Sequence, residues 1–163
     1  MNSIPALTIE NVASLDGILG DFLKKADADL TVVIDRGGNV ISQCGDMTVM
    51  DVTIVAALAA GSFAATRELA RRIGEVEFNA LYHQGNGSHI FMNSVDDETI
   101  MITVFGPRTT VGLVRFYSTG AAQQIAQLLQ SVHKNAHGFS FESGDISGAA
   151  VFAEPLPAPA PVS

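Results

Sequence analysis

The chain contains little cysteine and no long hydrophobic run. Cys44 is its only cysteine, so an intramolecular disulfide is excluded and a cytoplasmic location is the default expectation. No run of about eighteen apolar residues is present to suggest a membrane span. The segment Met1–Leu7 has neither the basic region nor the apolar core of a secretory signal. We therefore expect a cytoplasmic protein with no membrane insertion.

Positive charge is also scarce, with nine Lys and Arg residues against seventeen Asp and Glu residues and a net charge of −8. Because neutralisation of phosphates supplies most nucleic-acid affinity, no nucleic-acid partner is expected. Apolar residues make up 47% of the 163 residues and charged residues only 16%. This composition can fill the core of one domain and leaves apolar surface for protein partners.

The motifs of common catalytic centres are missing. A P-loop needs a lysine after a glycine to hold phosphate, and none of Lys24, Lys25 and Lys134 follows a glycine. There is no Gly-x-Ser-x-Gly nucleophile motif. Cys44 has no basic neighbour that would activate its thiol. We expect no catalytic residues and no cofactor, so the chain is not expected to be an enzyme.

The histidines form two pairs that could bind a metal. His133 and His137 are four residues apart on a predicted helix, and His83 and His89 flank a predicted turn, across which they could approach each other. No carboxylate completes a zinc motif around either pair. Solvated histidines are the favoured interpretation, and no metal site is expected.

Hydrophobic periodicity and turn residues predict the element order α-β-β-α-β-β-β-α. This is an α/β sandwich with a five-stranded, mainly antiparallel sheet. Residues 111–117 fit either a sixth strand or the start of the last helix, and we favour the helix. The expected helices span residues 8–26, 51–73 and 110–134, and Gly74 is expected to terminate the second of them. The expected strands span residues 30–34, 39–43, 78–83, 89–95 and 99–105.

The C-terminal part of the chain has a different composition. Apolar periodicity ends after His137, and four of the six prolines lie in Glu154–Pro161. Such a segment is typical of a polyproline-like or disordered tail. The expected organisation is one domain over residues 1–137 and a Pro/Ala-rich disordered tail over residues 138–163.

The helix 51–73 is apolar nearly all round, whereas a helix that only covers a sheet should be polar away from it. At roughly 100° per residue its side chains fall into three sectors. The sector expected to pack on the sheet contains Ile54, Leu58, Ala65, Leu69 and Ile73. A second sector, suited to a different partner, contains Thr53, Ala57, Ala60, Ala64, Arg67 and Arg71. The third, suited to a symmetric dimer, contains Ala59, Phe63, Thr66 and Ala70.

Several segments together resemble the Roadblock / dynein light chain superfamily, and within it the bacterial MglB-like branch. They are the hairpin Thr31–Ser42, the runs Ala59–Ala65 and Leu69–Glu75, and the segments Glu77–Gly85 and Phe105–Arg115. The likeness extends over about residues 8–134 in the order of elements derived above.

The resemblance implies a Roadblock-type (profilin/longin-like) sandwich that forms a homodimer through its second helix and third strand. It implies that the dimer binds a small Ras-like GTPase (MglA-like) of cell polarity and motility systems. GTP hydrolysis would be stimulated by rearrangement of the GTPase's own catalytic residues, without an inserted arginine. A Roadblock scaffold that recruits a GTPase or motility protein without affecting hydrolysis, and a small-ligand-sensing domain, remain alternatives.

The expected site residues lie mostly on the helix 51–73. For GTPase binding they are Ala57, Ala60, Gly61, Ala64, Arg67, Glu68 and Arg71. For the dimer interface they are Ala59, Phe63, Thr66, Ala70, Phe78 and Leu81. Arg67, Arg71 and Arg108 are also candidates for an arginine finger, but structural or solvated roles are favoured for all three.

Overall fold

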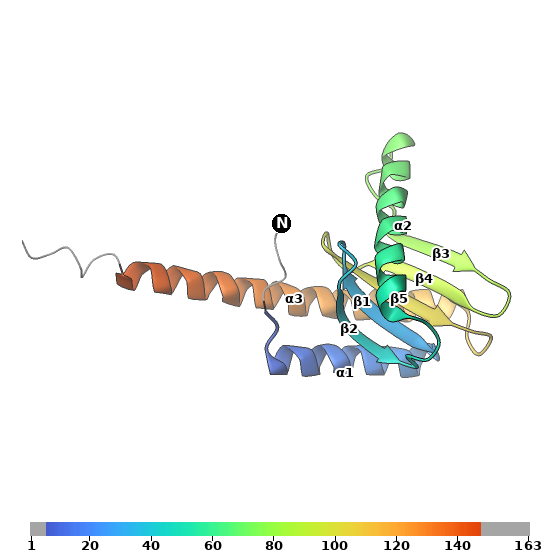
Figure 1. The fold of residues 1–163 in the computed structure, drawn as a ribbon, viewed down its shortest axis with the longest axis horizontal. Coiled ribbons are helices and arrows are strands. Elements are labelled where there is room, and N and C mark those ends of the chain that lie inside the picture. The colour runs from blue at the N-terminus through green and yellow to red at the C-terminus, as the bar shows by residue number, and fades with distance from the viewer. Residues whose placement is uncertain (1–5, 148–163) are drawn as a thin grey trace, which may run out of the picture.

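The computed structural model describes residues 6–147, and side chains over residues 6–138. The chain folds in the expected order of elements (Figure 1). The helices are α1 (Ile9–Ala26), α2 (Val52–Arg72) and α3 (Val111–Ser147). The strands are β1 (Leu30–Asp35), β2 (Val40–Gly45), β3 (Ala80–Gln84), β4 (His89–Ser94) and β5 (Thr99–Phe105).

The five strands form one antiparallel sheet in the order β2-β1-β5-β4-β3. Strand β5 lies at the centre, and all of its residues are buried. This agrees with its almost wholly apolar sequence, which predicts a strand covered on both faces. Strands β2 and β3 lie at the two edges, so each has a neighbouring strand on one side only within the described residues.

Helices cover both faces of the sheet (Figure 1). On one face α1 and α3 lie side by side, and they enclose Met101 and Phe105 of β5 together with Phe91 of β4. On the other face α2 packs over Ile100 and Ile102 of the same strand β5. Alternate residues of β5 therefore belong to two separate cores, as the period of two in a strand requires.

Helix α2 begins and ends where the sequence predicts. The Asp51 carboxylate accepts a hydrogen bond from the Ile54 amide at 3.3 Å, which caps the first turn. At the other end, Gly74 has a φ of +81°. The Glu75 amide donates to the Ala70 carbonyl at 2.9 Å and the Gly74 amide donates to the Arg71 carbonyl at 3.3 Å. This is the Schellman arrangement, which favours glycine at the left-handed position.

Helix α3 differs from the expected helix at its C-terminal end. Its start at Val111 confirms a helix rather than a sixth strand, but the expected end near Lys134 is wrong, because the helix continues to Ser147. Apolar periodicity reports packing against a neighbour, so its loss after His137 marks the part of α3 that extends past the sheet (Figure 1). The proline-rich part of the predicted tail lies outside the described residues.

Candidate functional site

The side of α2 that faces the sheet is formed by short side chains and one aromatic ring. Ala56, Ala59, Ala60 and Phe63 pack there with the residues of β1 and β5, and Phe63 is only 2% exposed. The expectation that Ile54, Leu58, Ala65, Leu69 and Ile73 would pack on the sheet is wrong, because all five are exposed.

The β1–β2 hairpin gives the physical reason for this orientation. Gly38, in the turn, has a φ of +87°, and a Cβ atom added to it would lie 2.9 Å from Ala57 Cα and 3.3 Å from the Ala56 carbonyl oxygen. The hairpin therefore lies directly against the first turns of α2. Only small residues on the helix permit this separation, so the alanine-rich side faces inward and the longer aliphatic side chains face outward.

This orientation corrects part of the predicted site. Ala59, Phe63 and Ala70, expected at a dimer interface, are buried within the subunit, whereas Thr66, Phe78 and Leu81 are half-buried. Ala60, expected to contact a GTPase, is also buried within the subunit. The other expected GTPase-contacting residues remain accessible, with Arg67 half-buried and the rest exposed: Ala57, Gly61, Ala64, Glu68 and Arg71.

The outward face of α2 is unusually apolar. Ile54, Leu58, Leu69 and Ile73 are 57%, 66%, 62% and 68% exposed, and together they form what we call the outer aliphatic face. At roughly 100° per residue, Ala57, Gly61, Ala64 and Glu68 lie along one flank of this face. Four large aliphatic side chains on one helix form the kind of patch that marks an interaction surface.

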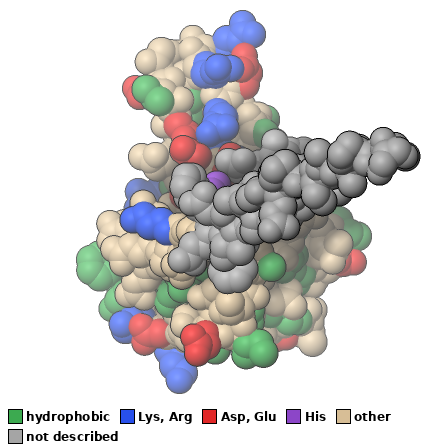
Figure 2. All heavy atoms as spheres, turned by 90° about the vertical axis from the view of Figure 1, so that its left-hand side faces the viewer, with side chains coloured by type: hydrophobic (Ala, Val, Ile, Leu, Met, Phe, Trp, Pro, Cys, Tyr) green, Lys and Arg blue, Asp and Glu red, His purple; other side chains and the backbone are tan. Residues whose placement is uncertain are grey.

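By length and composition, α2 is also the one helix of the described residues that could cross a membrane. Two features of α2 argue against a membrane span and for contact with protein. Its sheet-facing residues complete a core of the domain. Its last turns contain Arg67, Glu68, Arg71 and Arg72, and Figure 2 shows charged side chains gathered over this projecting end of the molecule. We therefore interpret the outer aliphatic face as a surface for another protein.

Beside α2, the same face of the sheet is incompletely covered. Helix α2 packs against β1 and β2. Toward the β3 edge of this same face, Leu81 of β3 and Ile90 of β4 are half-buried. Strand β3 has no strand beyond it within the described part of the chain. An open strand edge next to half-covered apolar side chains is a site where a second chain can pair.

An ion-pair cluster connects the C-terminal half of α2 to the rest of the domain. Arg36 Nη2 lies 2.9 Å from Glu77 Oε1, and Arg67 Nη2 lies 3.4 Å from the same oxygen. The Arg36 Nε also donates to the Asp97 carbonyl, and its guanidinium lies 5.6 Å from the centre of the Phe63 ring. The cluster joins the β1–β2 turn, α2 and the segment before β3. No local sequence pattern predicts this cluster, because Arg36 and Glu77 are far apart in the chain.

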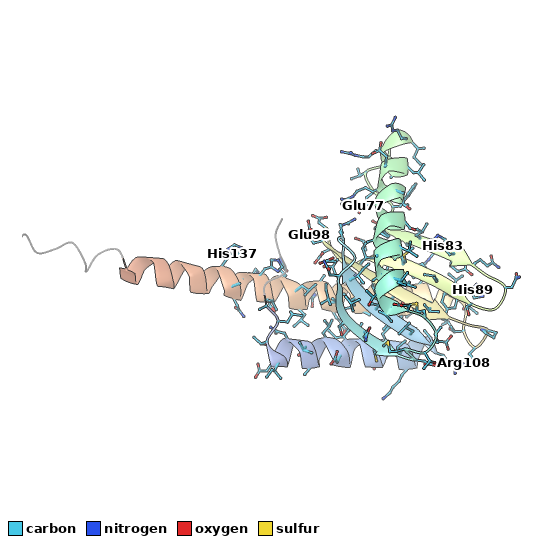
Figure 3. The ribbon with its side chains drawn as sticks, in the orientation of Figure 1. Glu77, His83, His89, Glu98, Arg108 and His137 are labelled. Atoms are coloured by element: carbon cyan, nitrogen blue, oxygen red, sulfur yellow. The ribbon has the colours of Figure 1, made fainter. Side chains whose placement is uncertain are left out.

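The arginines considered as possible fingers are all engaged with carboxylates. Arg67 pairs with Glu77, Arg71 Nη1 lies 3.7 Å from Glu68 Oε2, and Arg108 Nη2 lies 2.6 Å from Asp29 Oδ1. In Figure 3, Arg108 lies at the opposite end of the domain from Glu77. The three side chains therefore do not converge on one site.

The histidine pairs do not form a shared site. His83 pairs in register with Ile90, and His89 pairs with Gln84, so the two histidines point to opposite faces of the sheet (Figure 3). The idea that they approach each other across the hairpin is therefore wrong. His89 instead stacks on Phe105 with ring centres 5.2 Å apart, and its Nδ1 lies 3.2 Å from the Tyr82 hydroxyl. No group of three or more potential metal ligands occurs among residues whose side chains are described.

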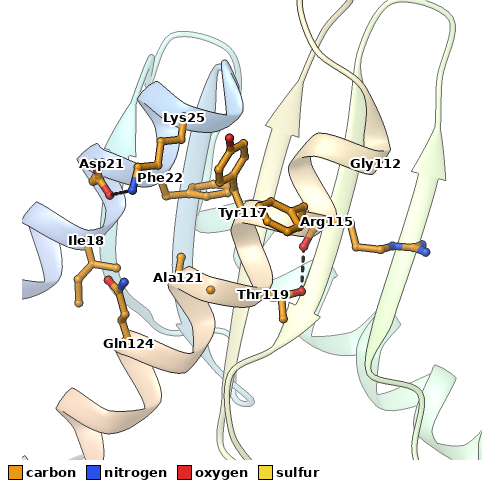
Figure 4. Close-up of a pocket in the computed structure, with 12 residues that line it drawn as sticks. Ile18, Asp21, Phe22, Lys25, Gly112, Arg115, Tyr117, Thr119, Ala121 and Gln124 are labelled. Atoms are coloured by element: carbon orange, nitrogen blue, oxygen red, sulfur yellow. Dashed lines mark hydrogen bonds and ion pairs between the residues drawn. The ribbon is translucent and has the colours of Figure 1, made fainter.

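Hollows lie along α3, and none of them was predicted. A groove of about 560 Å³ lies between α1 and α3, where Phe22, Phe116 and Tyr117 line it and the Asp21–Lys25 ion pair (2.8 Å) lies at its rim (Figure 4). A cleft of about 550 Å³ lies between α3 and the β3–β4 pair, and its lining includes Asn93 and Arg115.

Comparisons with known proteins agree with this architecture. The family model of the Roadblock/LC7 domain matches residues 15–105. The structure is similar to that of MglB from Myxococcus xanthus, with 29% sequence identity and a TM-score of 0.72, over 78% of this chain and 96% of that chain. No curated protein sequence matches the chain.

Two further solved structures share the fold. The gliding protein MglB from Thermus thermophilus is 23% identical, with a TM-score of 0.72 over 77% of this chain and 96% of that chain. A structure described as MglB with a tetrameric arrangement is 23% identical, with a TM-score of 0.73 over 78% of this chain and 96% of that chain. The predicted sandwich and its family resemblance are confirmed.

Proposed function

Since the chain belongs to the Roadblock/LC7 family, we propose that it is a cytoplasmic, non-catalytic homodimer that binds a small Ras-like GTPase of MglA type and stimulates its GTP hydrolysis. The observation that supports this most strongly is the outer aliphatic face of α2, whose four large side chains are each more than half exposed. The similarity to MglB supports the choice of a polarity or motility GTPase as the partner.

The outer aliphatic face and the open edge of β3 are the surfaces we assign to the dimer. A second copy related by a twofold axis would place its own α2 against Leu58 and Leu69, since such an interface repeats the same patch on both subunits. The same docking would cover Leu81 of β3, which is half-buried in one subunit. Burial of apolar area at about 25 cal/mol per Å² supplies the driving force.

The flank of α2 next to this face is the surface we assign to the GTPase. Ala57, Gly61 and Ala64 are exposed and short, and Glu68 and Arg71 follow them toward the end of the helix. Short side chains allow a partner's backbone to come close. The pairing of Arg67 and Arg108 with carboxylates supports stimulation through the GTPase's own catalytic residues rather than through an arginine supplied by this chain.

Single-turnover GTP hydrolysis by an MglA-type GTPase, with and without this protein, tests the proposal. We expect faster hydrolysis with the wild-type protein and no binding by Ala64→Arg, since overpacking a close contact costs about 1–3 kcal/mol and the new charge adds to this loss. Ala64→Ser is the matched control and should retain both activities.

The outcomes separate the alternatives. Binding of the GTPase without faster hydrolysis would identify a recruiting scaffold. If Ala64→Arg binds like the wild-type protein, the assigned flank of α2 is not the contact surface. Leu58→Asp examines the dimer separately: sedimentation should show dissociation into folded monomers, and an unchanged dimer would rule out the outer aliphatic face.

A further inference from the structure

The groove between α1 and α3 has aromatic walls. Phe22 belongs to the α1 wall, and Phe116 and Tyr117 belong to the α3 wall. Figure 4 shows the Phe22 and Tyr117 rings between the two helices. The two α3 rings stand nearly perpendicular, with an interplanar angle of 80° and centres 5.1 Å apart. Phe116 is 71% exposed although it lines a groove of about 560 Å³, a volume typical of ligand sites. An exposed aromatic ring in such a groove marks a surface that another apolar group covers.

Two glycines keep the groove open on the α3 side. Gly112, Phe116 and Gly120 all line it, and because they are four residues apart they follow one another along one side of the helix. A Cβ atom added to Gly120 would meet no atom within 4 Å. Glycine weakens a helix interior, and packing within the subunit does not require it here. The missing side chain therefore leaves space beside the Phe116 ring for a bound chain.

The chain itself contains a segment whose chemistry suits this groove. Residues 154–161, Glu-Pro-Leu-Pro-Ala-Pro-Ala-Pro, lie outside the described residues and have a proline at every second position. Such a sequence favours the polyproline II conformation, and ligands of this kind bind in aromatic-lined grooves. Their proline rings pack on aromatic side chains such as Phe116. Their backbone carbonyls have no internal partner, so the Tyr117 hydroxyl can donate to one of them.

The length of α3 separates this segment from the groove of its own subunit. From Gly120 to the end of α3 at Ser147 the helix rises about 40 Å, at 1.5 Å per residue. The seven residue steps from Ser147 to Glu154 span at most about 25 Å when fully extended. Glu154 therefore ends about 15 Å short of Gly120 in the same subunit, so the whole proline segment cannot lie along its own groove. Helix α3 instead extends past the sheet, toward other molecules (Figure 1).

We propose that the groove between α1 and α3 binds residues 154–161 of a second copy of this chain. The proline rings pack on Phe22 and Phe116, and the Tyr117 hydroxyl donates to a carbonyl of the bound segment. Tail and groove are different surfaces, so the contact joins subunits head to tail. The groove lies on the α1 and α3 side of the sheet, whereas α2 covers the opposite face. The proposal therefore does not rest on GTPase binding or on the dimer surface of α2.

A fluorescent peptide of residues 153–163 tests the groove by anisotropy. It is titrated with a full-length tail variant whose own segment cannot compete, because it carries Pro155→Ala, Pro157→Ala, Pro159→Ala and Pro161→Ala. We expect binding, and we expect Gly120→Leu or Phe116→Ser in this chain to weaken it at least tenfold. Gly17→Leu is the matched control, since Gly17 also has an open Cβ position but does not line the groove. A peptide with the same four alanines should bind at least tenfold more weakly.

Three results of this titration would overturn the proposal: no binding of the peptide, equal binding by Gly120→Leu and Gly17→Leu, or equal binding of the two peptides. Each would show that the groove does not recognise the proline segment.

Mixing two full-length variants tests whether the segment comes from a second copy. One carries Gly120→Leu to block its groove, and a spin label at Ser163→Cys in a Cys44→Ser background. The other is the isotope-labelled tail variant, which has an open groove and no proline segment. We expect the label to broaden the Tyr117 and Gly120 amide signals of the tail variant. A labelled copy that also carries the four alanines should not broaden them. Absence of broadening in the first mixture, or equal broadening in both, would overturn binding of a second copy's segment.

Discussion

The Arg36 Nη2 atom lies 2.9 Å from Glu77 Oε1, although 41 residues separate the two in sequence. Both side chains are largely shielded from solvent. The pair connects the β1–β2 turn with the segment that leads from α2 into β3. It therefore fixes the position of α2 relative to the edge strand, and both of these elements belong to the proposed dimer surface.

Arg36→Ala should lower the free energy of unfolding by about 1–3 kcal/mol. The change removes a half-buried ion pair, a hydrogen bond to the Asp97 carbonyl and the contact with the Phe63 ring. Urea denaturation measures the loss. Arg72→Ala is the matched control, since Arg72 pairs with Glu68 in an exposed position, and it should cost about 0–1 kcal/mol. Equal losses in the two variants would contradict a structural role for the Arg36 cluster.

Gly38→Ala should destabilise the fold by about 1–3 kcal/mol. The residue has a φ of +87°, and its new Cβ would lie 2.9 Å from the Ala57 Cα atom, so both strain and a backbone clash oppose the change. Gly17→Ala in α1 is the control, because nothing lies within 4 Å of that Cβ position. The control should gain about 0.5–1 kcal/mol from helix propensity. Thermal melts of the two variants should therefore shift in opposite directions.

The carboxyl group of Asp46 should titrate below its ordinary value of 3.8, because the Thr48 hydroxyl and then the Thr48 amide donate hydrogen bonds that lower its pKa. A carboxyl group whose pKa is lower in the folded state than in the unfolded state stabilises the fold at pH values above its unfolded-state pKa. This stabilisation is lost as the pH falls through the folded-state pKa. An NMR pH titration should show the Asp46 pKa rising toward 3.8 in Thr48→Val. Thr48→Ser keeps the hydroxyl and should retain the low pKa; a normal pKa in the wild-type protein would refute the contact.

The element order could be predicted from sequence because each element has a local signal. Asp51 and Gly74 mark the two ends of α2, and the apolar run Thr99–Phe105 marks the central strand. The end of α3 could not be predicted in this way, since periodicity reports contact with the sheet and not helix formation itself. The Arg36–Glu77 pair and the cleft at Asn93 depend on contacts between distant segments, which no local pattern contains.

The orientation of α2 was predicted incorrectly for a different reason. Its sequence has aliphatic side chains in one sector and alanines with Phe63 in another, and both sectors can be buried. The larger aliphatic residues favour the first sector when only one subunit is considered. The close approach of the Gly38 turn to Ala57 selects the other sector. Burial within a subunit and burial between subunits leave the same apolar pattern in the sequence.

The corrected orientation makes a direct prediction for Phe63 and Leu69. Phe63 is 2% exposed in the core beneath α2, so Phe63→Ala should lower the free energy of unfolding by about 3–5 kcal/mol at every protein concentration. Leu69 is exposed on the outer aliphatic face, so Leu69→Ala should change the stability of the monomer by no more than about 0.5 kcal/mol. Its effect should instead appear as a weaker dimer in sedimentation equilibrium, since the proposed dimer places this side chain between subunits. Urea denaturation over a range of concentrations distinguishes the two effects, because stability supplied by dimerisation depends on concentration. If Leu69→Ala destabilises the dilute monomer as much as Phe63→Ala does, Leu69 packs inside the subunit and the outward orientation of this face is incorrect.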